Sequence, residues 1–428
     1  SSAASDVYKR QYLDGGVVVI GRDPRPSGEM ILNALIGGLL STGCSIIDVG
    51  VCPTPTMQHA VVDLGADGGI AITASHHPAP WNALKFCRED GIFLNEYQAE
   101  ELLSIYHQGA FIQRGHDALG RIGRDEGAIN RHLTRVLMSV DRDAIAARAP
   151  KVVIDSVNGA GADCAEGLLQ KMGCEVVAIN DVPNGRFPRD PEPIPENLGQ
   201  LCAAVREHQA DIGFAQDADG DRLAVVSEQG VAIGEEFTLT FAADVMAERR
   251  TGTLVTNLSS SRMIDEVARR HGCKVVRSKV GEVHVAETMM AEQAIGGGEG
   301  NGGVINPELH YCRDNLAAMA LILEGMARRG VTVTEWAESF APSAIVKDKV
   351  PCQAGYTQRG ILALQRHYGD MPMDLTEGVK VFFDGGAWLH ARPSNTEPII
   401  RVIAEADDYA TARAICDEAI EVLQEAIQ

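Results

Sequence analysis

The chain has 428 residues, of which 38 are lysine or arginine and 59 are aspartate or glutamate, so its formal net charge is −21. A surface this negative repels nucleic acid and anionic lipid, which excludes both as bulk partners, and an anionic substrate would need cationic side chains focused in a cleft. No apolar stretch reaches the length of a membrane span, and the first residues show no apolar signal-peptide core. The ten cysteines include no CxxC pair. We therefore expect a cytoplasmic protein with reduced thiols.

Three segments, residues 17–49, 151–179 and 253–276, share one pattern: a short apolar strand, a polar loop, an amphipathic helix, a Gly-Cys pair and a second strand. In the first segment the helix is expected over Glu29–Ser41, and a glycine directly after a helix suits a left-handed C-cap. Short continuous apolar strands that alternate with amphipathic helices indicate largely parallel sheets covered by helices. Any α/β protein can show such units by chance, but three copies with the same Gly-Cys ending favour three related domains.

The C-terminal part has a different pattern, with strands expected at Val379–Phe383, Trp388–Arg392 and Ile399–Ala404 and a helix from Tyr409. We therefore predict an α/β fold with three similar mixed-sheet α/β domains and a smaller C-terminal α+β domain. The predicted domains cover residues 12–148, 149–250, 251–345 and 346–428. Linkers are expected near Ala147–Pro150, Arg249–Gly252 and Pro342–Val350.

A loop rich in serine and histidine, Thr73–Pro78, directly follows the apolar strand Gly69–Thr73. The carboxyl end of a strand in an open α/β sheet is where ligands usually bind. Ser75, His76 and His77 bring a hydroxyl and two imidazoles into a small space. A turn that only caps a helix is the alternative interpretation.

An acidic loop with Asp217, Asp219 and Asp221 separates two apolar strands, Ile212–Ala215 and Leu223–Val226. Carboxylates at alternate positions of an extended turn can point to one side, and they repel one another unless a cation neutralises them. Ligands that are all oxygen select a hard cation, with Mg²⁺ first. An EF-hand is excluded because the helix–loop–helix frame and the glutamate at loop position 12 are missing. A solvated acidic turn remains the alternative.

A glycine-rich loop, Gly296–Gly303, lets the backbone approach a ligand closely. Within it, Glu299 and Asn301 offer the acceptors and donors that sugar hydroxyls require. A flexible linker is the alternative, but the loop is short and lies between the patterned segments Ala291–Ile295 and Val304–Ile305.

The fourth polar loop, Arg392–Pro398, lies between two prolines and is followed by Arg401. The planar guanidinium of Arg392 matches phosphate oxygens, and backbone N–H groups of such a turn can also bind an anion. Neutral donors in the same loop are Ser394, Asn395 and Thr396. The loop thus offers the cationic focus that an anionic substrate needs, although a simple hairpin turn is not excluded.

With these four loops in this order, the chain resembles the α-D-phosphohexomutase superfamily from about Val17 to its end. That family carries a TASHNP-type serine loop, a DGDGDR-type metal loop, a sugar loop with a glutamate and an RPSNTEP-type phosphate loop, one in each domain. Here they stand as Thr73–Pro78, Asp217–Arg222, Gly298–Gly303 and Arg392–Pro398. The resemblance implies four domains around a central cleft, and an isomerase that interconverts hexose 6-phosphate and hexose 1-phosphate.

The resemblance also implies roles for single residues. Ser75 would carry a phosphoryl group that completes the shell of one Mg²⁺ ion beside the three aspartates, and Arg222 would brace this group. His76 and Lys85 would lie among the active-site polar groups, and Lys85 would carry a proton if nearby cations lowered its pKa. The residues implied in binding the sugar and its second phosphate are Glu299, Asn301, Arg392, Ser394, Asn395, Thr396 and Arg401.

The implied partner is a small phosphosugar, and a sugar bisphosphate, the intermediate of the cycle, is the expected activator. A homodimer remains open. The sugar and phosphate loops are most similar to the phosphoglucosamine mutase branch, but mannose and glucose phosphates stay open because one changed hydroxyl is worth only a few kcal/mol. A metal-dependent sugar phosphatase and a non-catalytic sugar-phosphate binding protein are the alternatives from other classes.

Some positions depart from the family pattern. His77 stands where asparagine is usual, Ala218 where glycine is common, and the sugar loop lacks the histidine that ends it in some relatives, so His310 is a candidate to replace that ring. Ser1–Gln11 lacks the Gly-Thr-x-Gly-x-Arg-Gly-type segment with which family members begin. We therefore expect a first strand and its arginine to be missing, with lower stability or activity as the result.

Overall fold

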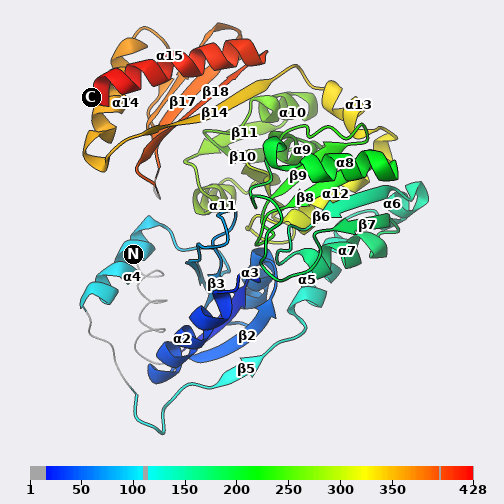
Figure 1. The fold of residues 1–428 in the computed structure, drawn as a ribbon, viewed down its shortest axis with the longest axis vertical. Coiled ribbons are helices and arrows are strands. Elements are labelled where there is room, and N and C mark those ends of the chain that lie inside the picture. The colour runs from blue at the N-terminus through cyan, green and yellow to red at the C-terminus, as the bar shows by residue number, and fades with distance from the viewer. Residues whose placement is uncertain (1–15, 109–113, 395–396, 428) are drawn as a thin grey trace.

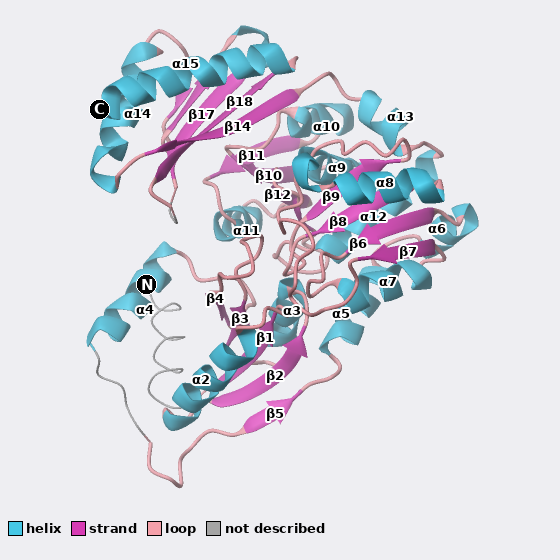
Figure 2. Ribbon diagram, viewed as in Figure 1, coloured by secondary structure: helices cyan, strands magenta, loops and turns pink. Residues whose placement is uncertain are grey.

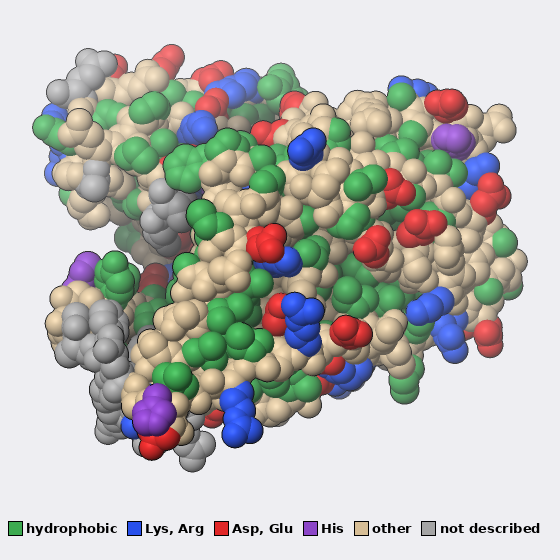
Figure 3. All heavy atoms as spheres, turned by 60° about the horizontal axis from the view of Figure 1, so that its bottom comes forward, with side chains coloured by type: hydrophobic (Ala, Val, Ile, Leu, Met, Phe, Trp, Pro, Cys, Tyr) green, Lys and Arg blue, Asp and Glu red, His purple; other side chains and the backbone are tan. Residues whose placement is uncertain are grey.

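The computed structural model describes residues 16–108, 114–394 and 397–427. Its strands form four sheets, which follow one another along an arc from the blue to the red end of the chain (Figure 1). On one side of the arc the molecular surface is hollowed between the first and the last domain (Figure 3). The prediction made for residues 1–11 lies outside the described residues.

The first sheet has the order β4-β3-β1-β2-β5, and only its β3–β4 pair is antiparallel. Its strands are β1 (Val17–Arg22), β2 (Ser45–Val51), β3 (Gly68–Ile72), β4 (Leu84–Arg88) and β5 (Ile122–Arg124). The helices of this part are α2 (Gly28–Ser41), α3 (Thr54–Asp63), α4 (Glu96–Gln108), α5 (Ala128–Met138) and α6 (Arg142–Arg148).

The second sheet, β7-β6-β8-β9, and the third sheet, β11-β10-β12-β13, repeat this connectivity. The second consists of β6 (Lys151–Asp155), β7 (Glu175–Ile179), β8 (Ile212–Gln216) and β9 (Leu223–Ser227), with helices α7 (Ala162–Lys171), α8 (Gly199–His208) and α9 (Glu236–Arg249). The third consists of β10 (Thr253–Asn257), β11 (Lys274–Ser278), β12 (Gly296–Glu299) and β13 (Gly303–Ile305), with helices α10 (Met263–His271), α11 (Glu282–Ala291), α12 (Asn315–Arg329) and α13 (Val333–Glu338).

The predicted threefold repeat is confirmed, because β1-α2-β2, β6-α7-β7 and β10-α10-β11 are equivalent units. The glycines after the three helices, Gly43, Gly173 and Gly272, have φ angles of +89°, +85° and +66°, as a left-handed helix end requires. In each sheet a third strand then pairs parallel with the first strand and turns back into an antiparallel fourth strand. The three sheets therefore each have one antiparallel reversal at the same topological position.

The largest hydrophobic core joins the second and third domains around α12. Every residue of this helix from Asn315 to Met326 is buried, so the helix has no polar face. Phe241 of α9 stacks on Trp336 of α13 with ring centroids 4.1 Å apart and closes one end of this core. The two domains thus form a firm base for the loops that project from their sheets.

The C-terminal domain has an antiparallel sheet of order β14-β18-β17-β16-β15, with both of its helices on the outer face (Figure 2). The elements are β14 (Ala344–Pro351), β15 (Met373–Asp374), β16 (Val379–Phe382), β17 (Trp388–Pro393), β18 (Ile399–Ala406), α14 (Ala354–His367) and α15 (Tyr409–Ile427). The segment Pro342–Val350, predicted as a linker, is thus mostly strand β14. Its buried Val346 and Val350 alternate with polar residues, the pattern of an edge strand with one buried face.

The inner face of this sheet contacts the third domain through buried polar side chains. Lys380 donates to the carbonyl oxygen of Leu258 (2.6 Å), and a ring nitrogen of His390 lies 2.8 Å from the hydroxyl of Ser259. Glu405, fully buried, accepts a bond from the backbone N–H of Arg262 (2.9 Å). These bonds fix one end of the C-terminal sheet on the loop that follows β10.

Lys380 should make the stability of the protein depend on pH in the alkaline range. Burial, followed by the charge of Arg277, lowers the pKa of this lysine from 10.5 to about 7. Between these two pKa values the unfolded chain binds a proton that the folded chain has lost, so the free energy of unfolding should rise with pH from about 7 to 10.5. Below pH 7 the folded chain binds this proton too, and the gain in stability from the neutral lysine is absent. We expect Lys380→Met to abolish this rise in urea unfolding experiments across the window, whereas Lys349→Met, an exposed lysine on β14, should keep it.

None of the described helices combines the length and the apolar character that crossing a membrane requires.

Candidate active site

Three of the four predicted loops occupy the equivalent reversal of the three related sheets. The serine loop lies between β3 and β4, and the acidic loop joins β8 to β9. The segment Gly296–Gly303, predicted as a glycine-rich loop, is mostly strand, and only residues 300–302 join β12 to β13. Each loop therefore follows the carboxyl end of a strand that is parallel to the first strand of its sheet, where ligands bind in open α/β sheets. The repeated topology explains why segments far apart in the sequence present their polar groups in the same way.

Ser75 lies next to the acidic loop. Its hydroxyl donates to Oδ2 of Asp217 at 3.0 Å, and its side chain is nearly buried, with 7% of the residue exposed. The backbone of Ser75 has a φ of +49°, a left-handed conformation that is uncommon for a residue with a side chain. The hydroxyl of Thr73 accepts the N–H of Ser75 (2.9 Å) and so supports this turn. Such a backbone outlier in a loop is typical of functional sites.

Sequence reasoning missed a buried arginine that holds the backbone of the serine loop in place. The guanidinium of Arg25 is bound to the carboxylate of Asp23 (2.8 Å) and donates to four carbonyl oxygens of the loop, those of Ser75, His77, Pro78 and Trp81. Asp23 also accepts the hydroxyl of Thr73 (2.7 Å). The loop is therefore held by fixed bonds and not by packing alone.

The three aspartates of the acidic loop are completely buried, and each offers a ligand atom within 4.8 Å of the other two. Oδ1 of Asp219 and Oδ1 of Asp221 are buried without a hydrogen-bond partner. Burial, and then the charges of Asp221 and Asp219, raise the pKa of Asp217 well above its usual value. Unpaired buried carboxylate oxygens are costly, so this donor set fits a hard divalent cation such as Mg²⁺.

Lys85, on β4, reaches the same aspartates from the first domain. Its ammonium donates to Oδ2 of Asp219 at 2.7 Å and lies 3.4 Å from Oδ2 of Asp221. Burial lowers the pKa of Lys85, but the charges of Asp219 and Asp221 outweigh burial, so the net shift is upward. The condition under which Lys85 would carry a proton, a pKa lowered by nearby cations, is therefore not met in the arrangement found here, and the lysine carries a positive charge.

His76 and Arg222 lie at the edge of the serine and acidic loops. Nδ1 of His76 is 3.5 Å from the hydroxyl of Ser75, and burial, then the charges of Arg222 and His77, lower the pKa of His76 to about 2. This imidazole is therefore neutral at physiological pH. The backbone N–H of Arg222 donates to Asp217 (3.1 Å), while its buried Nε makes no hydrogen bond with the described residues and lies 3.9 Å from Oδ1 of Asp221.

The sugar loop places Glu299 at the end of β12, where its carboxylate is buried. Oε1 accepts the amide of Asn257 (2.8 Å) and the N–H of Gly281 (2.9 Å), and Oε2 accepts a guanidinium N–H of Arg313 (2.8 Å). Burial raises the pKa of Glu299, but Arg313 and Asn257 outweigh burial and lower it overall. The amide of Asn301 lies 3.4 Å from Oε2 of the same carboxylate. Glu299 is thus an ionised and firmly oriented acceptor.

Gly300 should not tolerate a side chain. A Cβ atom on this residue would lie 2.0 Å from Oε2 of Glu236, whose carboxylate is held by the N–H of Ser261 and the ammonium of Lys347. We expect Gly300→Ala to shift the sugar loop and to raise KM on the order of tenfold, because misplacement of positioning groups costs rate and binding. Steady-state kinetics measure this effect. Gly37→Ala, in α2 with open space around the new Cβ, is the matched control and should leave KM unchanged.

The phosphate loop extends from the end of β17. Arg392 is 3.5 Å from Oε1 of Glu377, and Oε2 of Glu377 accepts the N–H of Val280, the neighbour of the glycine that binds Glu299. Burial lowers the pKa of Arg392, and its buried Nε has no partner among the described residues. Arg392 therefore lies beside the sugar loop.

The other predicted residues of this loop are only partly placed. The N–H of Ser394 donates to the carbonyl of Ile399 (3.0 Å), and the guanidinium of Arg401 pairs with Glu397 at 2.9 Å. Asn395 and Thr396 lie outside the described residues.

A second cluster of potential metal ligands lies apart from these loops. His59, His132 and Asp314 each place one ligand atom within 4.8 Å of the others. However, Arg135 donates to Nδ1 of His59 (3.1 Å), so the neutral ring keeps its proton on Nε2 and has no lone pair there for a metal. Nε2 of His132 is already 2.8 Å from Asp314, whose other oxygen caps α12. We therefore interpret this cluster as structural.

His310, expected as a candidate for the active site, belongs to this structural cluster instead. Its ring lies 5.2 Å from the ring of His59, and its Nε2 is so close to Gly91 that a Cβ there would be 2.5 Å away. The ring therefore packs between the first and third domains.

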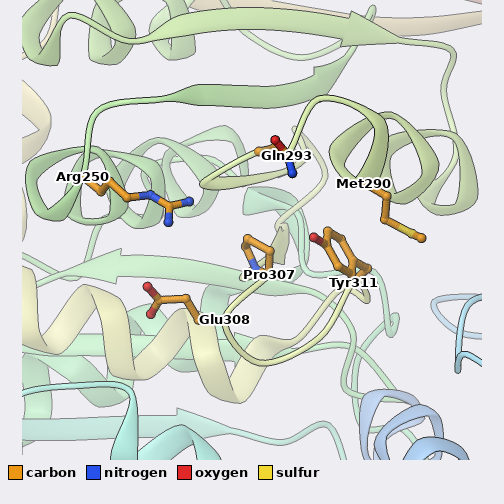
Figure 4. A pocket seen from close by; sticks show the side chains of 7 residues that line it. Arg250, Met290, Gln293, Pro307, Glu308 and Tyr311 are labelled. Atoms are coloured by element: carbon orange, nitrogen blue, oxygen red, sulfur yellow. The ribbon is translucent and has the colours of Figure 1, made fainter.

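A surface cavity of about 510 Å³ lies apart from the place where the four loops come together (Figure 4). Met290 and Tyr311 are at one end of this cavity, and Arg250 and Glu308 are at the other. None of its lining residues belongs to the serine, acidic, sugar or phosphate loops.

Four family models match four successive segments of this chain, one for each domain. The four family models for phosphoglucomutase/phosphomannomutase, namely the α/β/α domains I, II and III and the C-terminal domain, match residues 1–113, 130–230, 234–343 and 346–422.

Similar proteins span nearly the whole chain. A phosphoglucomutase/phosphomannomutase of Thermococcus kodakarensis is 38% identical and covers 100% of this chain and 94% of its own length. A probable phosphoglucosamine mutase of Methanopyrus kandleri is 36% identical, and the match covers 98% of this chain and 92% of that protein. The crystal structure of a phosphoglucomutase/phosphomannomutase family protein from Burkholderia thailandensis matches with a TM-score of 0.85 at 26% identity, over 99% of this chain and 91% of that one. The chain belongs to the phosphoglucomutase/phosphomannomutase family of α-D-phosphohexomutases and is a phosphohexomutase.

Proposed function

We propose that this phosphohexomutase interconverts glucosamine 6-phosphate and glucosamine 1-phosphate through a phosphoserine at Ser75. The observation that carries the proposal is the 3.0 Å contact between the Ser75 hydroxyl and Asp217 inside the buried aspartate cluster. Three nearby carboxylates do not make a serine hydroxyl more acidic, so they do not by themselves activate Ser75. A phosphate on Ser75, in contrast, would share a divalent cation with the three carboxylates. Several relatives are named probable phosphoglucosamine mutases, which supports the amino sugar as substrate.

One Mg²⁺ ion would be held by Asp217, Asp219 and Asp221 together with an oxygen of the phosphorylated Ser75. When bound, the ion withdraws charge from the phosphoryl group and stabilises the transition state of its transfer. Thr54 and Lys85 hold Oδ2 of Asp219, which leaves its Oδ1 for the cation. The unpaired oxygens of two aspartates therefore support the choice of these three ligands.

The chemistry conserves phosphate over a full cycle. A hydroxyl of the bound hexose monophosphate attacks the phosphorus of phosphoserine, the bond from phosphorus to Oγ of Ser75 breaks, and the proton of the hydroxyl ends on this Oγ. The bisphosphate that forms turns over in the cleft, and its other phosphoryl group returns to Ser75. A sugar bisphosphate would therefore act as activator, because it phosphorylates any enzyme that has lost its phosphoryl group.

Residues from the third and fourth domains would orient the hexose in both poses. Glu299 and Asn301 accept and donate to its hydroxyls, while Arg392, Ser394 and Arg401, with Asn395 and Thr396, bind the phosphate that is not reacting. Lys85 and Arg222 would bind the phosphoryl group in transfer, since the ammonium lies 2.7 Å from Asp219 and the guanidinium Nε lies 3.9 Å from Asp221. Neutral His76 could exchange a proton with a group near Oγ of Ser75.

The substrate is tested by a coupled assay with glucosamine, mannose and glucose phosphates in the presence of Mg²⁺ and a trace of the corresponding bisphosphate. We expect the highest kcat/KM with glucosamine phosphate, and intact-mass spectrometry should show an added phosphate on Ser75. A higher value with mannose or glucose phosphate would overturn the assignment of the sugar. Release of inorganic phosphate without isomerisation would instead indicate a phosphatase.

A further inference from the structure

Arg313 is a buried arginine that none of the sequence motifs includes, yet it contacts both the acidic loop and the sugar loop. It lies between β13 and α12, is paired with Ile305 through an isolated β-bridge, and is only 7% exposed. A buried guanidinium is stable only when its donors are paired. The identity of its partners therefore indicates what it does.

The three partners come from three different elements. NH2 donates to Oδ2 of Asp221 at 2.6 Å, NH1 donates to Oε2 of Glu299 at 2.8 Å, and Nε donates to Oε2 of Glu282 at 3.1 Å. Asp221 belongs to the second domain, Glu299 ends β12, and Glu282 begins α11. One rigid, planar group therefore fixes the distance between the metal-binding carboxylates and the sugar-binding carboxylate.

The two carboxylate oxygens of Asp221 have different contacts. Oδ2 is taken by Arg313 and by Lys85, whereas Oδ1 is buried, accepts no hydrogen bond from the described residues and lies 3.9 Å from the Nε of Arg222. The guanidinium thus orients the free oxygen toward the cation site, but its positive charge also opposes a divalent cation nearby. At Glu299 the same guanidinium keeps the carboxylate ionised and aimed.

We infer that Arg313 is a positioning residue that couples the two half-sites, weakening the affinity for the divalent cation while strengthening the affinity for the hexose phosphate. The inference rests on the proposed function for the identity of the ligands. Its distinctive consequence is that the loss of Arg313 changes the two affinities in opposite directions. A residue that only stabilised the fold would weaken both.

The test is calorimetric binding in a Ser75→Ala background, in which the proposed phosphoserine cannot form and no turnover is needed. Titration with Mg²⁺ alone should show binding on the order of tenfold tighter for Arg313→Met, because one positive charge next to the cation is removed. Titration with glucosamine 6-phosphate should show binding on the order of tenfold weaker, because Glu299 loses its charged partner.

Two further variants make the result specific. Arg313→Lys keeps the charge but not the three-way contact, so it should leave Mg²⁺ affinity near that of the parent and still weaken sugar-phosphate binding. Arg88→Met is the matched control, because Arg88 pairs with Asp90 and Glu287 away from the aspartate cluster, and it should change neither affinity.

Two outcomes would overturn the inference: weaker binding of both ligands in Arg313→Met, or affinities equal to those of the parent. Failure of the proposed function has a different signature, since the wild-type protein would then prefer mannose or glucose phosphate, or would carry no phosphate on Ser75. The Mg²⁺ titration remains decisive in that case, because it depends only on the charges around the aspartates. If Arg313→Met does not fold, Arg313→Lys decides by its own expected result: unchanged binding of glucosamine 6-phosphate, or weaker binding of Mg²⁺, would overturn the inference.

Discussion

Replacing Ser75 by alanine should lower turnover with any hexose phosphate on the order of 10⁴-fold or more, to the detection limit of a coupled assay. The reason is chemical: the proposed cycle passes through a bond between phosphorus and Oγ of Ser75, and the variant has no atom that can form this bond. Because the polar contacts of the hydroxyl are those with Asp217 and, at 3.5 Å, with His76, the fold should be nearly unaffected, and thermal unfolding should begin within a few degrees of the wild-type protein.

The matched control is Ser104→Ala, an exposed serine on α4 far along the chain from the serine loop. It should retain wild-type kcat and KM. If Ser75→Ala kept more than a small fraction of the activity, phosphoryl transfer through this serine would be refuted, while the family assignment would stand.

Replacing Asp219 by asparagine should weaken Mg²⁺ binding on the order of a hundredfold and lower kcat by a similar factor at limiting Mg²⁺. Asparagine keeps the size of the side chain but removes a charged ligand, and its amide leaves the ammonium of Lys85 without its shortest ion pair. Isothermal titration with Mg²⁺ measures the affinity. Raising the Mg²⁺ concentration should restore part of the activity.

Asp181→Asn, an exposed aspartate, removes the same charge elsewhere and should leave the Mg²⁺ affinity unchanged. Equal Mg²⁺ affinities of Asp219→Asn and the wild-type protein would show that the acidic loop does not hold the cation. Loss of activity that no concentration of Mg²⁺ relieves would point instead to the orientation of Lys85 as the main role of Asp219.

The sequence was sufficient to predict features that depend on local patterns. The three β-α-β repeats could be recognised because helix periodicity, strand composition and the glycine at each helix end are properties of short segments. The acidic loop was also predictable, since three carboxylates at alternate positions are costly without a cation. Strand β14 was missed because its charged residues and the prolines near its two ends, Pro342 and Pro351, suggested a linker, although Val346 and Val350 are buried on one face as in an edge strand.

Residues that act through distant contacts could not be found in this way. Arg25 and Arg313 each serve several partners, but those partners lie on other loops and leave no spacing in the sequence. The charge state of Lys85 shows the same limit, because its pKa depends on Asp219 and Asp221, more than a hundred residues further along the chain. Long-range electrostatics therefore had to come from the structure.

The shared reversal between the third and fourth strands has a consequence for how this enzyme can change. Each of the three functional loops joins two neighbouring strands of its own sheet, so the strands set the framework of each domain. Substitutions in these loops that keep the buried contacts of Arg25, Asp219 and Glu299 should alter catalysis or selectivity more than expression and yield. Loop exchange between distant homologues, one bend at a time, is therefore a practical way to redesign this scaffold.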